Sequence, residues 1–72
     1  MRIRTGVKAH DDACLAAEVT RQNAVAAAAN QAAVTAAEII FYRTVRDSAR
    51  ANGLTAELGA FNQTIRSLGG SP

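Results

Sequence analysis

The stretch that decides the fold runs from Ala13 to Ala51 and reads ACLAAEVTRQNAVAAAANQAAVTAAEIIFYRTVRDSARA. It belongs to a longer segment, starting at Lys8, that contains neither proline nor glycine. Alanine has the highest helix propensity of all residues, and proline and glycine have the lowest. The sequence therefore predicts one continuous helix over residues 8–52, on the order of 60 Å long at 1.5 Å per residue.

Residues 1–7 are predicted to form an extended N-terminal arm. Apolar Ile3 stands between the basic residues Arg2 and Arg4, and Gly6 disfavours a helix in this segment.

The C-terminal part of the chain predicts a second, shorter helix over residues 55–68. Asn52-Gly53 ends the long helix, because glycine readily takes the left-handed conformation that follows a helix C-terminus. Thr55 is expected to cap the second helix, and residues 69–72 form a tail. The fold class is all-α: one domain over residues 1–72, with a long N-terminal helix and a short antiparallel C-terminal helix forming a helical hairpin.

The short helix, about 20 Å long, can cover the long helix only as far back as Glu38. The large apolar residues of this region form the predicted hairpin core: Ile40, Phe41, Val45, Leu58, Phe61, Ile65 and Leu68. Residues 13–37 are left without an intrachain partner, and their apolar residues circle much of the helix, as in helices buried in assemblies. The residues expected to contact other chains are Leu15, Val19, Val25 and Val34, with Ile3 from the arm. The alternative is that alanine simply keeps a straight helix in water.

Length and composition also favour an assembly. A chain of 72 residues buries only about 60% of the surface that its unfolded form exposes, and such chains depend on disulfides, metals or oligomerisation. Cys14 is the only cysteine, so an intrachain disulfide is excluded. The sequence shows no apolar run of the roughly 20 residues that a membrane span needs. It shows no signal peptide either, so we expect an intracellular product without membrane partners.

The residues suited to catalysis or metal binding are few. His10, Asp11 and Asp12 are the only cluster, and adjacent residues rarely all reach one ion. No glycine-rich phosphate loop, paired-cysteine zinc spacing or nucleophile elbow occurs. The sequence therefore predicts no catalytic residues, no metal site and no cofactor, and the protein is not expected to be an enzyme.

Basic residues form two groups. Arg43, Arg46 and Arg50 lie on neighbouring turns, and they indicate either phosphate contact or a solvated helix end that favours cations, with Arg43 paired to Asp47. We favour the second interpretation. For the arm residues, which include Arg2 and Arg4, contact with nucleic acid or an acidic partner and simple solvation are equally supported. The net charge of +2 decides neither case.

Several motifs resemble small helical proteins encoded by tailed bacteriophages and prophages of proteobacteria. They are AAEIIFYR at residues 36–43, SARANGL at residues 48–54, and Phe61 followed by SLG at residues 67–69. The resemblance covers most of the chain. It implies a phage context, and it carries no functional residues with it.

Together these features lead to the hypothesis of a minor structural protein of a tailed-phage virion. Its alanine-rich helix would pack against copies of itself or larger proteins of the capsid or head–tail region. The protein would be located in the virion, or in the host cytoplasm before assembly. The alternative, suggested by the basic residues, is a phage accessory protein that binds and inhibits a host or nucleic-acid machine.

Overall fold

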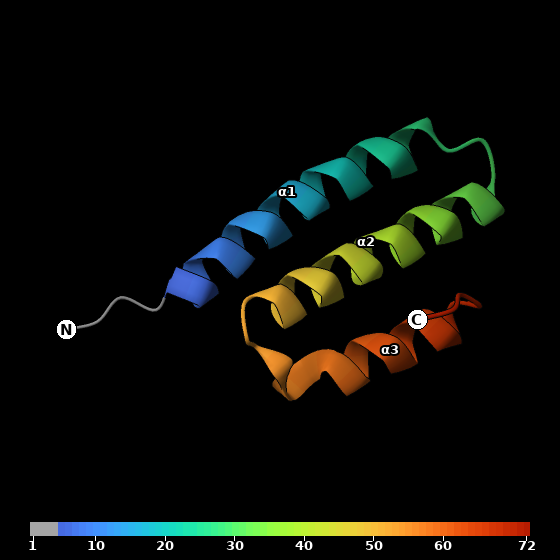
Figure 1. Ribbon diagram of the computed structural model, residues 1–72. Coiled ribbons are helices and arrows are strands. Elements are labelled where there is room, and N and C mark those ends of the chain that lie inside the picture. Colours follow the sequence, from blue (N-terminus) through green and yellow to red (C-terminus); the bar gives the residue numbers. More distant parts are fainter. Residues whose placement is uncertain (1–4) are drawn as a thin grey trace.

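The computed structural model describes residues 5–72 and shows an all-α protein with three α-helices. Helix α1 spans Thr5–Ala27, α2 spans Gln31–Ala51 and α3 spans Leu58–Ser67, with a short 3-10 helix at Thr55–Glu57 before α3. The three helices lie side by side with α2 in the middle, and each runs antiparallel to its neighbour (Figure 1). Across the described residues, α1 and α3 both pack on α2 and make no contact with each other.

The predicted single helix over residues 8–52 is wrong, because the alanine tract folds back on itself at residues 28–30. Asn30 has an extended backbone (φ −157°, ψ 174°), and its Oδ1 accepts a hydrogen bond from the Ala33 N–H at 2.9 Å. It is the N-cap of α2, because it satisfies one of the N–H groups that a helix start leaves unpaired. The preceding helix closes with a tight turn in which Ala28 N–H donates to the Val25 carbonyl.

This break also overturns the expectation that residues 13–37 lack an intrachain partner. The first part of the tract, in α1, packs along α2, so each helix covers one side of the other. Folding back removes apolar surface from water that a straight helix would expose, which favours the hairpin of α1 and α2.

The expected extended arm is also wrong where the structure describes it. Helix α1 begins at Thr5, so residues 5–7 are helical. Gly6 is tolerated because the cost of glycine in a helix is only about 1 kcal/mol relative to alanine. Residues 1–4, which include the proposed contact residues Arg2, Ile3 and Arg4, lie outside the described part of the chain.

The helix end predicted at Asn52-Gly53 is confirmed as the end of α2, and α3 is likewise followed by a glycine, Gly69. Gly53 and Gly69 have positive φ angles of 74° and 90°. At the first, Leu54 N–H donates to the Ala49 carbonyl at 2.8 Å and Gly53 N–H donates to the Arg50 carbonyl, which is the Schellman pattern. The same pattern recurs at the end of α3. Thr55 does not cap a helix as expected; it begins the 3-10 helix, which has no side-chain cap.

The core is small. Among residues 7–72 the buried apolar side chains are Ala17, Ala37, Val45, Ala49 and Ile65. Three of them are alanines, and Ile65 is the one large side chain that is fully buried. Of the other predicted core residues, Phe41, Leu58, Phe61 and Leu68 are half-buried. Ile40 is 58% exposed, so its assignment to the core is wrong.

The C-terminal tail is held against α2. Arg43 donates from Nε and Nη2 to the Ser71 carbonyl at 2.9 and 2.6 Å. Gly70 lies so close to α2 and α3 that a Cβ at this position would be 2.9 Å from Ile39 Cγ2 and 3.1 Å from Ile65 Cγ2. The tail therefore closes the α2–α3 contact where α3 ends.

Candidate protein-interaction surface

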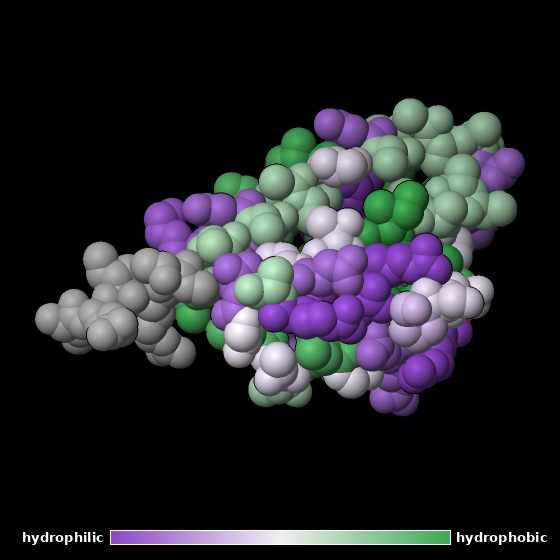
Figure 2. Space-filling view, in the orientation of Figure 1, coloured by the Kyte–Doolittle hydropathy of each residue, from purple (hydrophilic) through white to green (hydrophobic). Residues whose placement is uncertain are grey.

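An apolar groove of about 360 Å³ runs between α1 and α2. Alanine and threonine provide most of its walls, so it is shallow and lined by small side chains. Ile40 and Phe41 are its large apolar residues. The lining residues from α1 are Ala13, Ala16, Ala17, Thr20, Arg21 and Ala24, and those from α2 are Ala37, Ile40, Phe41 and Thr44. Figure 2 shows apolar surface over α1 and the α1–α2 turn, beside a hydrophilic band that follows α2.

Arg21 forms the polar side of this groove. Its guanidinium lies 5.3 Å from the centre of the Phe41 ring, and Phe41 in turn stacks edge-on against Tyr42 with ring centres 5.2 Å apart. Arg21 also donates to both carboxylate oxygens of Glu18, from Nε at 3.2 Å and from Nη2. A cation placed over an aromatic ring is attracted to it, so Arg21 links α1 to α2 by its charge as well as by packing.

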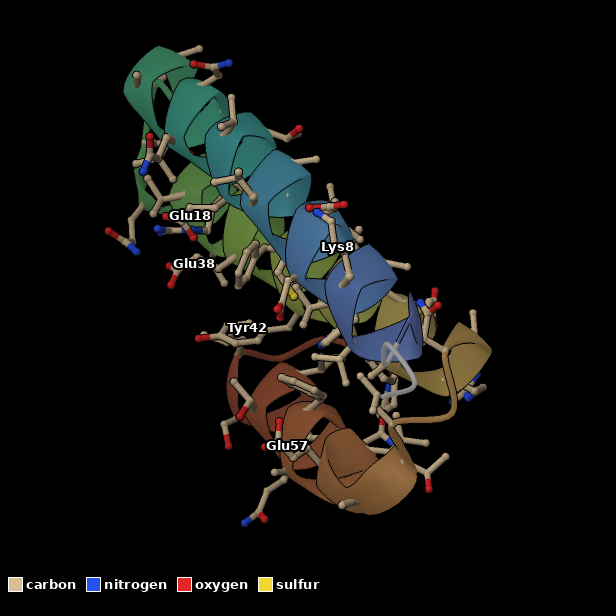
Figure 3. The ribbon with its side chains drawn as sticks, turned by 90° about the vertical axis from the view of Figure 1, so that its left-hand side faces the viewer. Lys8, Glu18, Glu38, Tyr42 and Glu57 are labelled. Atoms are coloured by element: carbon tan, nitrogen blue, oxygen red, sulfur yellow. The ribbon has the colours of Figure 1, made fainter. Side chains whose placement is uncertain are left out.

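The Arg21–Glu18 pair shifts the titration of both groups. Hydrogen bonding from Arg21 holds the pKa of Glu18 below its usual value, although some burial of the carboxylate opposes this. The pKa of Arg21 is raised, first by its hydrogen bond to Glu18 and further by the charges of Glu18 and Glu38. Figure 3 shows Glu18 on α1 and Glu38 and Tyr42 on α2 along the same edge of the hairpin. This edge of the hairpin is therefore polar.

The residues predicted to contact other chains fall into two classes in the structure. Leu15 and Val19, four residues apart on one face of α1, are 67% and 50% exposed. Leu15 is nine residues from Ala24 of the groove, which places it on the opposite side of α1 at 3.6 residues per turn. Val25 and Val34 are half-buried beside the α1–α2 turn. Leu15 and Val19 therefore form a second apolar patch, separate from the groove.

His10 has a structural partner that the sequence did not reveal. Its Nδ1 lies 3.0 Å from Ser48 Oγ on α2, and Cys14 Sγ lies 3.5 Å from its Nε2. Asn52 donates to the Ser48 carbonyl at 2.8 Å. Burial, and secondly the charge of Asp11, raise the pKa of Cys14, so the thiol stays protonated and a poor nucleophile. The arrangement links α1 to the end of α2.

No metal-binding group of three His, Cys, Asp or Glu residues occurs within the described residues. Asp12, one of the three residues considered for such a site, is paired with Lys8 at 3.2 Å on the outer side of α1.

The three arginines of α2 do not form an open stripe. Arg46 is 8% exposed; it donates to Asn62 Oδ1 on α3 at 3.2 Å and pairs with Asp47 at 3.0 Å. Arg43 binds the C-terminal tail rather than Asp47, which had been its expected partner. Arg50 is exposed and lies 4.0 Å from Asp47. Arg43 and Arg46, two of the three α2 arginines, thus stabilise the fold rather than face solvent.

Comparison of the chain with protein-family models, with curated proteins and with solved structures found no match. No helix within residues 5–72 has both the length and the apolar character to cross a membrane.

The sequence alone does not reveal the groove, because the groove exists only once α1 and α2 are separate helices. A signal was present in the alanine tract: small or apolar residues recur at 33, 36, 40 and 44, with spacings of three and four. That spacing marks one face of a helix. In a single straight helix this face would be exposed to solvent. It lines a groove because the chain breaks at Asn30, which lets α1 pack beside α2.

Proposed function

We propose that this protein is a minor structural component of a multi-chain assembly, in which its exposed apolar surfaces are covered by other chains. The observation that supports this is the single layer of helices, in which residues 7–72 contain one large side chain that is fully buried. A helix layer normally buries its apolar side against a second layer. Here the groove and the Leu15–Val19 patch remain exposed, and three large apolar side chains, Leu15, Val19 and Ile40, are at least half exposed.

The resemblance to small proteins of tailed phages suggests which assembly it is. We propose the virion, with larger proteins of the capsid or head–tail region as partners. The uncovered part of the chain that first motivated this idea is smaller than the sequence implied, since α2 covers one side of α1. What motivates it now is the exposed apolar surface that remains.

Mass spectrometry of purified phage particles tests the proposal. We expect this chain in the particles in several copies, and we expect Leu15→Glu with Val19→Glu to reduce its incorporation. Gln63→Glu, an exposed change on α3 outside both apolar surfaces, is the control and is expected to be incorporated normally. Absence of the chain from wild-type particles would contradict the proposal.

The alternative, an accessory protein that binds a host or nucleic-acid machine through its arginines, has less support from the structure. Arg46 is buried and Arg43 holds the tail. Of the three α2 arginines, Arg50 is exposed enough to contact a phosphate.

A further inference from the structure

We propose that the α1–α2 groove is the contact surface for a second copy of this chain, and that two copies form an antiparallel four-helix bundle. The inference rests on the proposed function, because it names one of the chains that cover the exposed surfaces. It concerns the groove rather than the Leu15–Val19 patch, which lies on the opposite side of α1.

The exposed residues beside the groove follow helix-packing spacing on both helices. On α2 they are Ala33, Ala36, Ile40, Thr44, Asp47 and Ala51, with steps of three and four residues. On α1 the residues Ala9, Ala16, Thr20, Ala24 and Ala27 repeat the pattern. All are exposed, and most are small. Small residues at these spacings let a facing helix approach to the short end of the usual 8–10 Å range between axes.

The groove face carries both a large exposed side chain and a surface of small side chains on which such a side chain could pack. Ile40 is its one large exposed side chain, and Thr20 and Ala24 line the same groove on the neighbouring helix. A two-fold axis parallel to the helices places α1 of one copy over α2 of the other. Ile40 of each copy then packs on Thr20 and Ala24 of its partner, because α1 and α2 keep their relative heights. All neighbouring helices in this bundle are antiparallel, which suits their dipoles.

The area is sufficient for a specific dimer. Helix α1 has 23 residues, so the hairpin face is about 34 Å long. Two helices about 9 Å apart, each about 10 Å wide, make it about 19 Å across. Two such faces cover on the order of 1,300 Å², within the range of specific interfaces.

Sedimentation equilibrium of the full chain, from micromolar to millimolar concentration, tests the inference. We expect a species of twice the 7.5 kDa chain mass, and a monomer for Ile40→Glu. Leu15→Glu, a matched change on the opposite side of α1, should leave the dimer intact. Helical circular dichroism spectra should be unchanged in both variants, since both side chains are more than half exposed.

Cross-linking tests the geometry separately. In a Cys14→Ala background, a chain with Thr20→Cys mixed with a chain carrying Ile40→Cys should form the mixed disulfide. The pair Leu15→Cys and Ile40→Cys should not. A monomeric wild-type chain at millimolar concentration, or a dimer that survives Ile40→Glu, would overturn the inference. Particle mass spectrometry is independent of that result: a monomeric chain found in virions would leave the proposed function standing and would indicate that a different protein fills the groove.

Discussion

At the residue scale, the end of the chain is fixed by Gly70. A methyl group at this position would meet Ile39 and Ile65 at 2.9 and 3.1 Å, and overpacking of this kind typically costs 1–3 kcal/mol. We expect Gly70→Ala to lower the free energy of unfolding by about that amount, measured by urea denaturation. Gly59→Ala is the matched control, because nothing lies within 4 Å of its added Cβ. It should stabilise α3 by up to about 1 kcal/mol. Equal effects of the two changes would contradict this account of the tail.

The pair of Glu18 and Arg21 gives stability a pH dependence. The pKa of Glu18 is lower in the folded chain than in the unfolded one, because Arg21 hydrogen-bonds its charged form. Its stabilising contribution is therefore complete above the unfolded pKa and is lost as the pH falls through the folded pKa. We expect the melting temperature of Glu18→Gln, relative to wild type, to be lower at neutral pH and to converge with it in acid. In an Arg21→Gln background the same substitution should change the pH profile little, and an undiminished effect there would assign the shift to another group.

At the element scale, helix ends at glycine could be predicted from the sequence, whereas the break in the alanine tract could not. Gly53 and Gly69 end helices because they alone supply the left-handed conformation at low cost. No such residue occurs at positions 28–30, and local propensity favours a helix straight through them. The turn is favoured by the packing of α1 on α2 that it permits. The free energy of that packing cannot be read from local helix propensity. The prediction that Ile40 lies in the core is wrong for the same reason, because the neighbours of this side chain depend on where the chain folds back.

Asn30 caps α2 at this break, so Asn30→Ala should weaken the break. Loss of a helix N-cap costs about 1 kcal/mol, and alanine at this position also favours continuing α1 into α2. We expect the variant to unfold at a lower urea concentration than the wild type. We also expect X-ray scattering to give it a larger radius of gyration than the wild-type chain, whose Cα value is 13.3 Å. Asn30→Ser, which retains a capping oxygen, should restore both. Asn23→Ala removes an exposed asparagine within α1 and should leave the radius unchanged. A compact, fully stable Asn30→Ala chain would show that helix packing alone sets the turn.

At the scale of the whole molecule, stability and assembly depend on two isoleucines in opposite environments. Ile65 is fully buried and Ile40 is 58% exposed. A chain of 72 residues has a total stability of roughly 4–11 kcal/mol. Ile65→Ala should remove 2–5 kcal/mol of it by leaving a cavity, a large share of the total. Ile40→Ala should cost little at low protein concentration, where an exposed side chain changes stability by about 0.5 kcal/mol or less.

The two variants should separate again when protein concentration is varied. If a second copy covers the groove, the melting temperature of the wild-type chain rises with concentration, because association stabilises the folded state by mass action. Ile40→Ala should lose most of that rise, whereas Ile65→Ala should keep it from a lower starting temperature. The measurement is a series of thermal melts from micromolar to millimolar protein, followed by circular dichroism. A concentration dependence that Ile40→Ala leaves intact would place the self-contact elsewhere, with the Leu15–Val19 patch as the surface to change next. Folding would then still depend on the small core around Ile65, and the groove would be left for a different chain.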